Sequence, residues 1–92
     1  MNIEFYFTNA GYKTFEGLPN EIQERMLEKV RNLKRHPRIF EIVKRIDFTP
    51  ATHRLRVGHY RLLLELKKNE PEQKIFWILM AGHRREVYRA KL

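Results

Sequence analysis

Three arginines, Arg54, Arg56 and Arg61, stand close together in the segment HRLRVGHYRLL. Guanidinium groups stay protonated at any cellular pH, and the fork of N–H donors on each of them matches the oxygens of a phosphate group. If the segment folds as a β-hairpin, the three side chains lie on one face of the sheet and the alternate apolar residues lie on the other. Their types and spacing therefore predict a clamp for a phosphodiester.

The turn inside this segment decides how close the arginines come. A glycine at the first position of a two-residue turn favours a hairpin, so Gly58 is predicted to bring Arg56 directly opposite Arg61. Like charges in that position destabilise a sheet by roughly a few tenths of a kcal/mol or more, so folding alone does not select the pair, whereas an anion would. In the alternative arrangement, the arginines extend into water or pair with Glu65 and Glu86.

A second group of polar side chains lies in the C-terminal segment AGHRREVYRAKL, directly after a predicted strand. The group comprises His83, Arg84, Arg85, Glu86, Tyr88 and Arg89. An imidazole titrates near neutral pH, and a phenol can hydrogen-bond a hydroxyl or stack on a base. The mixture of cations with two titratable groups favours a site that binds an anion and transfers a proton, although a single His or Tyr near a chain end is more often structural.

The elements that must position these residues are predicted to form a single α+β domain over residues 1–92, since no repeat or linker divides the chain. The apolar pattern predicts a strand over 2–8, a short helix over 9–18, a longer helix from Pro19 to about His36, and strands over 52–57, 60–67 and 74–81. The last strand is apolar on both faces and is expected inside the sheet. Residues 37–50 allow a short helix or a turn-rich connector, and the segment after Arg85 allows a strand or a helix.

The composition narrows the class of protein. Nineteen Lys and Arg against eleven Asp and Glu give 92 residues a net charge of +8, which favours a polyanionic partner, nucleic acid before an acidic protein. The chain has no cysteine, and its four histidines lack metal-motif spacing, which argues against disulfides, a thiolate nucleophile and a zinc site. It contains neither a secretory leader nor about 18 consecutive apolar residues, so we expect a cytoplasmic protein without a membrane partner.

Two motifs in combination resemble the RelE/ParE toxin superfamily of prokaryotic toxin–antitoxin systems. LRVG-x-YR and GHRR-x-VYR follow a helix that ends in HPR, and the likeness extends over essentially the whole chain. The resemblance implies an α+β fold with two N-terminal helices packed on a twisted, mainly antiparallel sheet of about four strands. For the RelE branch it implies ribosome-dependent cleavage of mRNA, no cofactor, and neutralisation by a cognate antitoxin, with the toxin–antitoxin complex often bound to operator DNA.

The resemblance also implies roles for individual residues. Arg61 matches the arginine after the hairpin tyrosine, Arg84 the arginine of the late strand, and Tyr88 the tyrosine of the C-terminal motif. The implied reaction is attack of an RNA 2′-hydroxyl on the adjacent phosphorus without a metal, which needs a base, positive charge at the phosphorane and an acid. The predicted catalytic residues are Arg61, Arg84, Tyr88 and His83, and the predicted RNA- and phosphate-binding residues are Arg54, Arg56, Arg85 and Arg89.

The identity of the general base stays open in this scheme. The RelE branch has lysines in the strand before the hairpin, where this chain has Thr52 and Arg54, and an arginine does not readily give up a proton. Tyr88 could orient the hydroxyl, take its proton or stack on a base. His83, and with less support His53 or His59, could act as acid or base.

Two other functions compete with RNA cleavage. A ParE-like toxin would poison DNA gyrase with the same fold and without nuclease residues. A member of the fold that has lost toxicity would act only as a nucleic-acid or partner-binding module. Translation arrest, replication arrest with DNA damage, and harmless overexpression distinguish the three.

Overall fold

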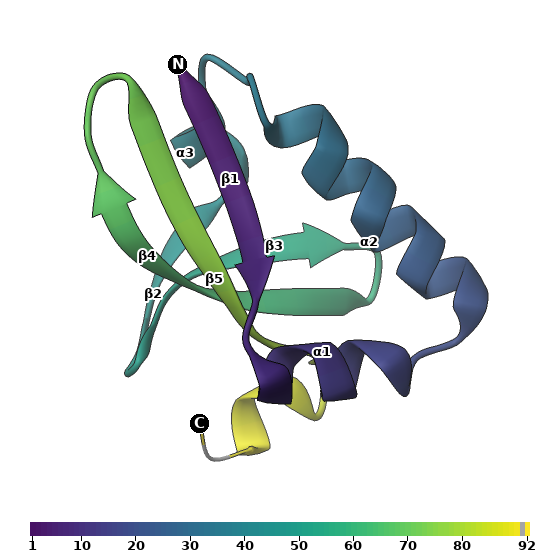
Figure 1. The fold of residues 1–92 in the computed structure, drawn as a ribbon. Helices are drawn as coiled ribbons and strands as arrows, with labels where there is room; N and C mark the ends of the chain where they lie inside the picture. The colour runs from purple at the N-terminus through teal and green to yellow at the C-terminus, as the bar shows by residue number, and fades with distance from the viewer. Residues whose placement is uncertain (91) are drawn as a thin grey trace.

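Five strands and three α-helices succeed one another in the computed structural model, which describes residues 1–90 and 92 (Figure 1). The elements are β1 (Asn2–Phe7), α1 (Asn9–Glu16), α2 (Asn20–Leu33), α3 (Ile39–Ile42), β2 (Lys44–Phe48), β3 (Ala51–Val57), β4 (Tyr60–Asn69), β5 (Gln73–His83) and the 3₁₀ turn η1 (Val87–Arg89). The strand order is β1-β5-β4-β3-β2, in which β1 runs parallel to β5 and all other neighbours are antiparallel. The predicted α+β fold is confirmed, with β5 inside the sheet and one strand more than the four expected.

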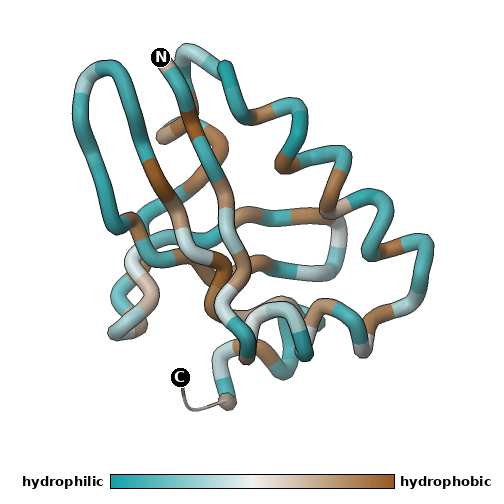
Figure 2. The backbone as a smooth tube through the Cα atoms, in the orientation of Figure 1, coloured by the Kyte–Doolittle hydropathy of each residue, from teal (hydrophilic) through white to brown (hydrophobic). Residues whose placement is uncertain are grey.

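The two N-terminal helices form where the sequence predicts them. The Thr8 side chain caps α1 by accepting a hydrogen bond from the Gly11 N–H, at 2.9 Å, and the helix ends at Gly17. Pro19 precedes α2, whose apolar stripe includes the buried Met26 and Leu33. Figure 2 shows apolar positions recurring along α2 among hydrophilic ones, as expected of a helix with one face against a core.

The strand β2 is the element that the sequence analysis missed. Residues 37–50 were open to a short helix or a connector, and they contain both the short helix α3 and this strand. The sequence of β2, KRIDF, is mostly charged, and only Ile46 and Phe48 have a packing role in it. Charged residues are common on edge strands, where they oppose edge-to-edge association. With so few apolar residues, β2 lacks the alternating pattern by which a strand is predicted.

The sheet separates two apolar clusters. The larger one lies between the sheet and the three helices and includes Phe15, Met26, Ile39, Leu55, Leu62, Phe76 and Ile78. The smaller one lies on the opposite side, which we call the open face, and joins Ala51, Leu63 and Val87. Because Val87 packs into this second cluster, the C-terminal segment is held against the open face at the end of β5.

The helix α1 continues the edge of β5 beyond the end of β1. The Ile78 carbonyl accepts a hydrogen bond from the Thr8 N–H, at 3.1 Å, and the Ala81 N–H donates to the Thr14 hydroxyl, at 3.0 Å. Gly11 permits this approach, because a Cβ at that position would overlap the Ile78 carbonyl. The end of β5, from which the C-terminal residues extend, is thereby fixed by α1.

Candidate functional site

The β3–β4 hairpin has the predicted register. Its paired residues are Val57 with Tyr60, Arg56 with Arg61, Leu55 with Leu62, and Arg54 with Leu63. Gly58 has a φ of 61°, a conformation that glycine adopts at no steric cost, and no other described residue has a positive φ. The two opposed arginines that the sequence predicts are therefore present on the open face.

Arg61 is the most constrained of the arginines. Its side chain is only 9% exposed, and Nη1 donates hydrogen bonds to the carbonyl oxygens of Gly58, at 3.0 Å, and Tyr60, at 2.9 Å. The hairpin turn thus fixes the orientation of the guanidinium before any ligand arrives. Among the described residues, no hydrogen bond occupies Nε or Nη2, so these donors are free to bind an anion.

Four charged or titratable groups lie within electrostatic reach of Arg61. Burial lowers the pKa of its guanidinium most, and the like charges of Arg56, Arg54 and Arg84 lower that pKa further, whereas Tyr88 acts in the opposite direction. The structure therefore brings residues of the hairpin and of the C-terminal segment together. We call these five residues, Arg54, Arg56, Arg61, Arg84 and Tyr88, the arginine cluster.

Local contacts place the two C-terminal members of the cluster. The Arg84 N–H donates to the His59 carbonyl, at 2.8 Å, which attaches the segment to the hairpin turn. Tyr88 belongs to η1 and packs edge-to-face on Phe48, with 5.6 Å between ring centroids. Its side chain is 39% exposed, so the phenol is both oriented by Phe48 and open to solvent.

His83 lies on the other side of the sheet from Arg61. It is paired with Tyr60, and their rings are in contact with 5.3 Å between centroids, next to the His59 ring at 6.3 Å. It also lines a recess that includes Lys13 of α1. A role for His83 as acid or base stays a prediction, and it requires RNA to pass around the end of β5.

The remaining predicted residues are not members of the arginine cluster. His53 is buried against Phe40 and Phe76 in the larger core. Arg85 and Arg89 are exposed and follow Arg84 and Tyr88 directly in the chain. Their part in phosphate binding stays a prediction.

The arginines of the cluster are not neutralised by nearby carboxylates. The ion pairs among residues 1–90 and 92 join Arg38 to Glu41, Lys67 to Glu65, and Lys68 to Glu70. The alternative in which the arginines pair with Glu65 and Glu86 is therefore not observed. In the same part of the chain, His, Asp and Glu form no group of three that could hold a metal ion, and no helix is long and apolar enough to cross a membrane.

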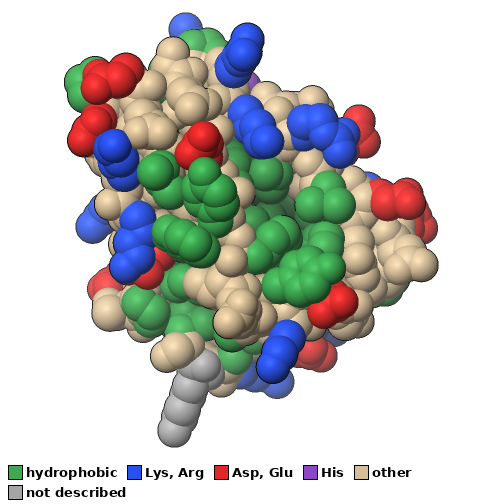
Figure 3. Space-filling model, in the orientation of Figure 1, with side chains coloured by type: hydrophobic (Ala, Val, Ile, Leu, Met, Phe, Trp, Pro, Cys, Tyr) green, Lys and Arg blue, Asp and Glu red, His purple; other side chains and the backbone are tan. Residues whose placement is uncertain are grey.

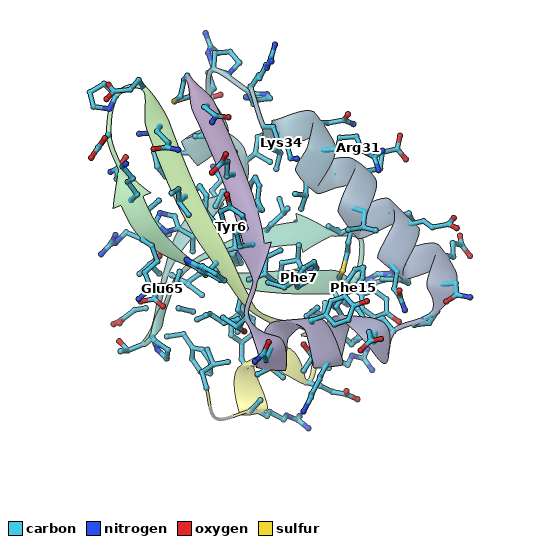
Figure 4. All side chains as sticks on the ribbon, in the orientation of Figure 1. Tyr6, Phe7, Phe15, Arg31, Lys34 and Glu65 are labelled. Atoms are coloured by element: carbon cyan, nitrogen blue, oxygen red, sulfur yellow. The ribbon has the colours of Figure 1, made fainter. Side chains whose placement is uncertain are left out.

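An apolar groove between β1 and α2 escaped the sequence analysis. It has a volume of about 240 Å³, with Phe5, Phe7, Phe15, Leu27 and Val30 in its lining and Arg31 and Lys34 at its rim. Figure 3 shows the hollow among hydrophobic side chains, and Figure 4 shows Phe7 and Phe15 pointing into it beneath α2. The one available signal was Leu27, a large apolar residue of α2 that lines the groove and is 42% exposed.

Comparison with known proteins relates this geometry to one family. Residues 12–88 match the family described as ParE toxin of type II toxin–antitoxin system, parDE. No curated protein matches the chain by sequence.

Solved structures share the fold. The chain is similar to a chain of the toxin–antitoxin complex RelBE2 from Mycobacterium tuberculosis, with 26% identity, a TM-score of 0.70, and coverage of 91% of this chain and 100% of that one. It is similar to a mutant of the E. coli toxin RelE in the free state, with 17% identity, a TM-score of 0.69, and coverage of 95% and 88%. It is also similar to a chain of the archaeal RelE–RelB complex from Pyrococcus horikoshii OT3, with 23% identity, a TM-score of 0.66, and coverage of 95% and 100%.

Proposed function

Since the chain belongs to the family of ParE toxins of type II toxin–antitoxin systems, within the RelE/ParE superfamily, we propose that it acts as a ribosome-dependent mRNA endonuclease. The observation that carries the proposal is the convergence of Arg54, Arg56 and Arg84 around the preoriented guanidinium of Arg61, beside Tyr88. A binding poison of gyrase has no use for a solvent-open phenol within electrostatic reach of a buried arginine. A nuclease that acts through a 2′-hydroxyl can use the arginine to stabilise the charge of the phosphorane and the phenol to orient or deprotonate the hydroxyl.

In the proposed reaction, the 2′-hydroxyl of one nucleotide attacks the adjacent phosphorus to form a 2′,3′-cyclic phosphate. The bond from phosphorus to the 5′-oxygen of the next nucleotide breaks, and that oxygen takes up a proton from solvent. Arg61 stabilises the negative charge of the phosphorane, because its position is fixed by two carbonyl oxygens before RNA binds. Arg84 and Arg56, whose charges both act on Arg61, hold further phosphate oxygens. Tyr88 orients the attacking hydroxyl or takes its proton.

The experiment that tests the proposal is primer-extension mapping of mRNA in a reconstituted translation reaction. Wild type is expected to cut within codons only when ribosomes are present, and both Arg61→Ala and Tyr88→Phe are expected to abolish or strongly reduce the cuts. Arg38→Ala serves as the control, because it removes an exposed arginine whose partner is Glu41. Intact mRNA under conditions where a known interferase cuts would refute the endonuclease.

One observation favours a gyrase poison as the second candidate. The matched family is that of ParE toxins, and Thr52 and Arg54 stand where the RelE branch has lysines. Expression in cells separates the two, since an endonuclease stops protein synthesis first and a gyrase poison stops DNA replication and induces DNA damage. Overexpression without either effect would support a non-toxic binding module.

We further propose that the partner of the toxin is a cognate antitoxin and that part of it binds the apolar groove. The groove offers an apolar lining with Arg31 and Lys34 at its rim, and the adjacent strand β1 is an edge strand with one side free for pairing. A segment with apolar side chains towards the groove and acidic ones towards the rim would complement this surface. Two of the similar structures contain RelB together with RelE.

A pair of substitutions on α2 tests the antitoxin site. Leu27→Lys places a charge in the groove and is expected to abolish co-purification with the antitoxin, whereas Glu24→Lys, on the exposed side of the same helix, is expected to leave the complex intact. Glu24→Lys changes the net charge of the protein by more than Leu27→Lys does. If net charge alone governed antitoxin binding, Glu24→Lys would therefore have the larger effect. Equal retention of the antitoxin by both variants would exclude the groove.

A further inference from the structure

The turn of the β3–β4 hairpin lies between two guanidinium groups. Arg61 contacts it through the Gly58 carbonyl, at 3.0 Å. Arg25 of α2 lies against the same glycine, since a Cβ at Gly58 would be 3.0 Å from its Nη2 and 3.5 Å from its Nη1. The turn therefore has a cation on the open face and another on the helix-covered face.

The second cation belongs to a recess between α2 and the hairpin. This recess has a volume of about 270 Å³ and is lined by Arg25 and Lys29 from α2 and by Arg56 from β3, with Glu28 also on its wall. Arg56 is the link between the two sides, because it lines the recess and its charge also acts on Arg61. Arg56 therefore connects the cations of the recess with the arginine cluster at the end of the sheet.

The cations of the recess lack carboxylate partners. None of the ion pairs among residues 1–90 and 92 involves Arg25, Lys29 or Arg56, although Glu28 lies nearby. Unpaired like charges repel one another and weaken the packing of α2 on the hairpin, so folding does not explain their concentration. An anion between them would remove the repulsion.

We propose that the recess binds the phosphodiester backbone of the RNA strand on one side of the cleavage position, so that the strand crosses the hairpin turn from the arginine cluster to α2. This inference rests on the proposed function for its RNA substrate. Gly58 is exposed and has no side chain, so a nucleic acid backbone can pass directly over the turn. Arg25 and Arg56 supply planar guanidinium donors, and Lys29 supplies a point charge.

The carboxylate in the recess selects the kind of anion. Glu28 repels negative charge, and the repulsion is stronger for a phosphate monoester or free phosphate, which carries nearly two charges, than for a phosphodiester, which carries one. Asn32, also on the wall, can donate to or accept from a ribose hydroxyl. The chemistry of the recess therefore fits an RNA backbone better than a small anion.

Two double variants of α2 test the proposal with matched charge. Arg25→Gln/Lys29→Gln removes the two cations that α2 contributes to the recess, and Arg31→Gln/Lys34→Gln removes the same charge from the groove rim at the C-terminal end of α2. The probe is a fluorescent single-stranded RNA with 2′-O-methyl sugars, which cannot be cleaved, and its anisotropy is titrated at several salt concentrations. Thermal unfolding of each variant verifies that the exposed substitutions leave the fold intact.

The recess variant is expected to bind at least about tenfold more weakly at low salt. Its slope of log affinity against log salt is expected to fall by about 0.7 for each phosphate that the variant no longer neutralises. The rim variant is expected to stay close to wild type. Equal weakening in both variants, or wild-type binding by the recess variant, would overturn the proposal. Equal competition by duplex DNA of the same length or by millimolar inorganic phosphate would also overturn it.

The binding measurement does not depend on whether the protein cleaves RNA, because the probe cannot be cleaved. If wild type binds the RNA through the recess and yet fails to cut mRNA on ribosomes, the endonuclease proposal fails and the binding site stands. If wild type cuts mRNA and the recess variant binds RNA as wild type does, the endonuclease stands and the recess has no part in it.

Discussion

Arg56 and Arg61 face each other directly across the β3–β4 hairpin, as a pair of like charges at the end of two neighbouring strands. Arg61 cannot turn away from its neighbour, because the Gly58 and Tyr60 carbonyls hold its Nη1. The electrostatic cost of the pair is therefore built into the folded state. A protein selected only for stability would place a threonine or a valine opposite Arg61.

Replacement of Arg56 by Thr is expected to stabilise the protein while it weakens RNA binding. The substitution removes the opposed charge and introduces a residue that favours strands, so the free energy of unfolding should rise by about 0.2 to 1 kcal/mol at low salt. The gain should shrink at high salt, because the repulsion between exposed charges is screened. Urea denaturation at both salt concentrations measures it.

The matched control for this substitution is Lys67→Thr on β4. Lys67 is exposed and pairs with Glu65 at 3.2 Å, so its removal relieves no repulsion and should give no comparable gain. A less stable Arg56→Thr protein at low salt would show that Arg56 is not in a repulsive environment in the free toxin.

The two titratable candidates of the C-terminal segment should differ sharply in activity. Tyr88 shares the open face with Arg61, whereas His83 lies with Tyr60 on the opposite side. Tyr88→Phe keeps the packing on Phe48 and removes only the hydroxyl, so we expect single-turnover cleavage to slow by about 10² to 10⁴-fold. His83→Gln should cleave at close to the wild-type rate.

Which of the two variants cleaves more slowly indicates where the scissile phosphate binds. If His83→Gln cleaved much more slowly than wild type and Tyr88→Phe stayed active, the scissile phosphate would lie near His83. It would then be bound in the separate recess that Lys13 and Tyr60 line. Rates are compared at saturating ribosome concentration, so that weaker binding is not mistaken for slower chemistry.

Local sequence signals explain which parts of the site were predictable. The register of the hairpin depends on Gly58 and on the alternation of apolar and charged residues on either side, all within one short segment, and this is why the sequence predicts the observed pairing of Arg56 with Arg61. The caps of α1 at Thr8 and Gly17 are equally local. The proximity of Arg84 and Tyr88 to Arg61 came from the family resemblance, since it depends on how η1 packs on the open face.

Features that depend on contacts distant in the sequence were missed. The side of the sheet on which His83 lies is set by its pairing with Tyr60, after a β-bulge between β4 and β5 has shifted the register. The groove exists only in the folded protein, where α2 lies beside β1 and an apolar gap remains between their side chains. Gly11 gave no signal of its own, because the need for a glycine there comes from the Ile78 carbonyl.

Gly11 and Gly17, at the two ends of α1, should respond oppositely to alanine. A Cβ at Gly11 would overlap the Ile78 carbonyl, so Gly11→Ala must displace α1 from β5 and is expected to cost about 1 to 3 kcal/mol or more of unfolding free energy. At Gly17 the nearest atom to a new Cβ is the Thr14 carbonyl oxygen, at 3.5 Å, and φ is −74°. Gly17→Ala should therefore be neutral or stabilise by up to about 1 kcal/mol. Thermal and urea unfolding compare them, and equal stabilities would show that α1 does not need the close approach.

His53 should make the stability of the protein depend on pH. Burial against Phe40 and Phe76 lowers its pKa below the ordinary value of 6.5, and the positive charge of Arg45 lowers it further. The neutral ring is therefore favoured in the folded state, and the unfolded chain binds the proton first as the pH falls. The contribution of His53 is fully present above about pH 6.5 and is lost as the pH falls from there towards its pKa in the folded state. Urea midpoints should drop over that range in wild type and change less in His53→Gln, whereas the exposed His59→Gln should follow wild type. A His53→Gln protein with the wild-type pH profile would assign the effect to another group.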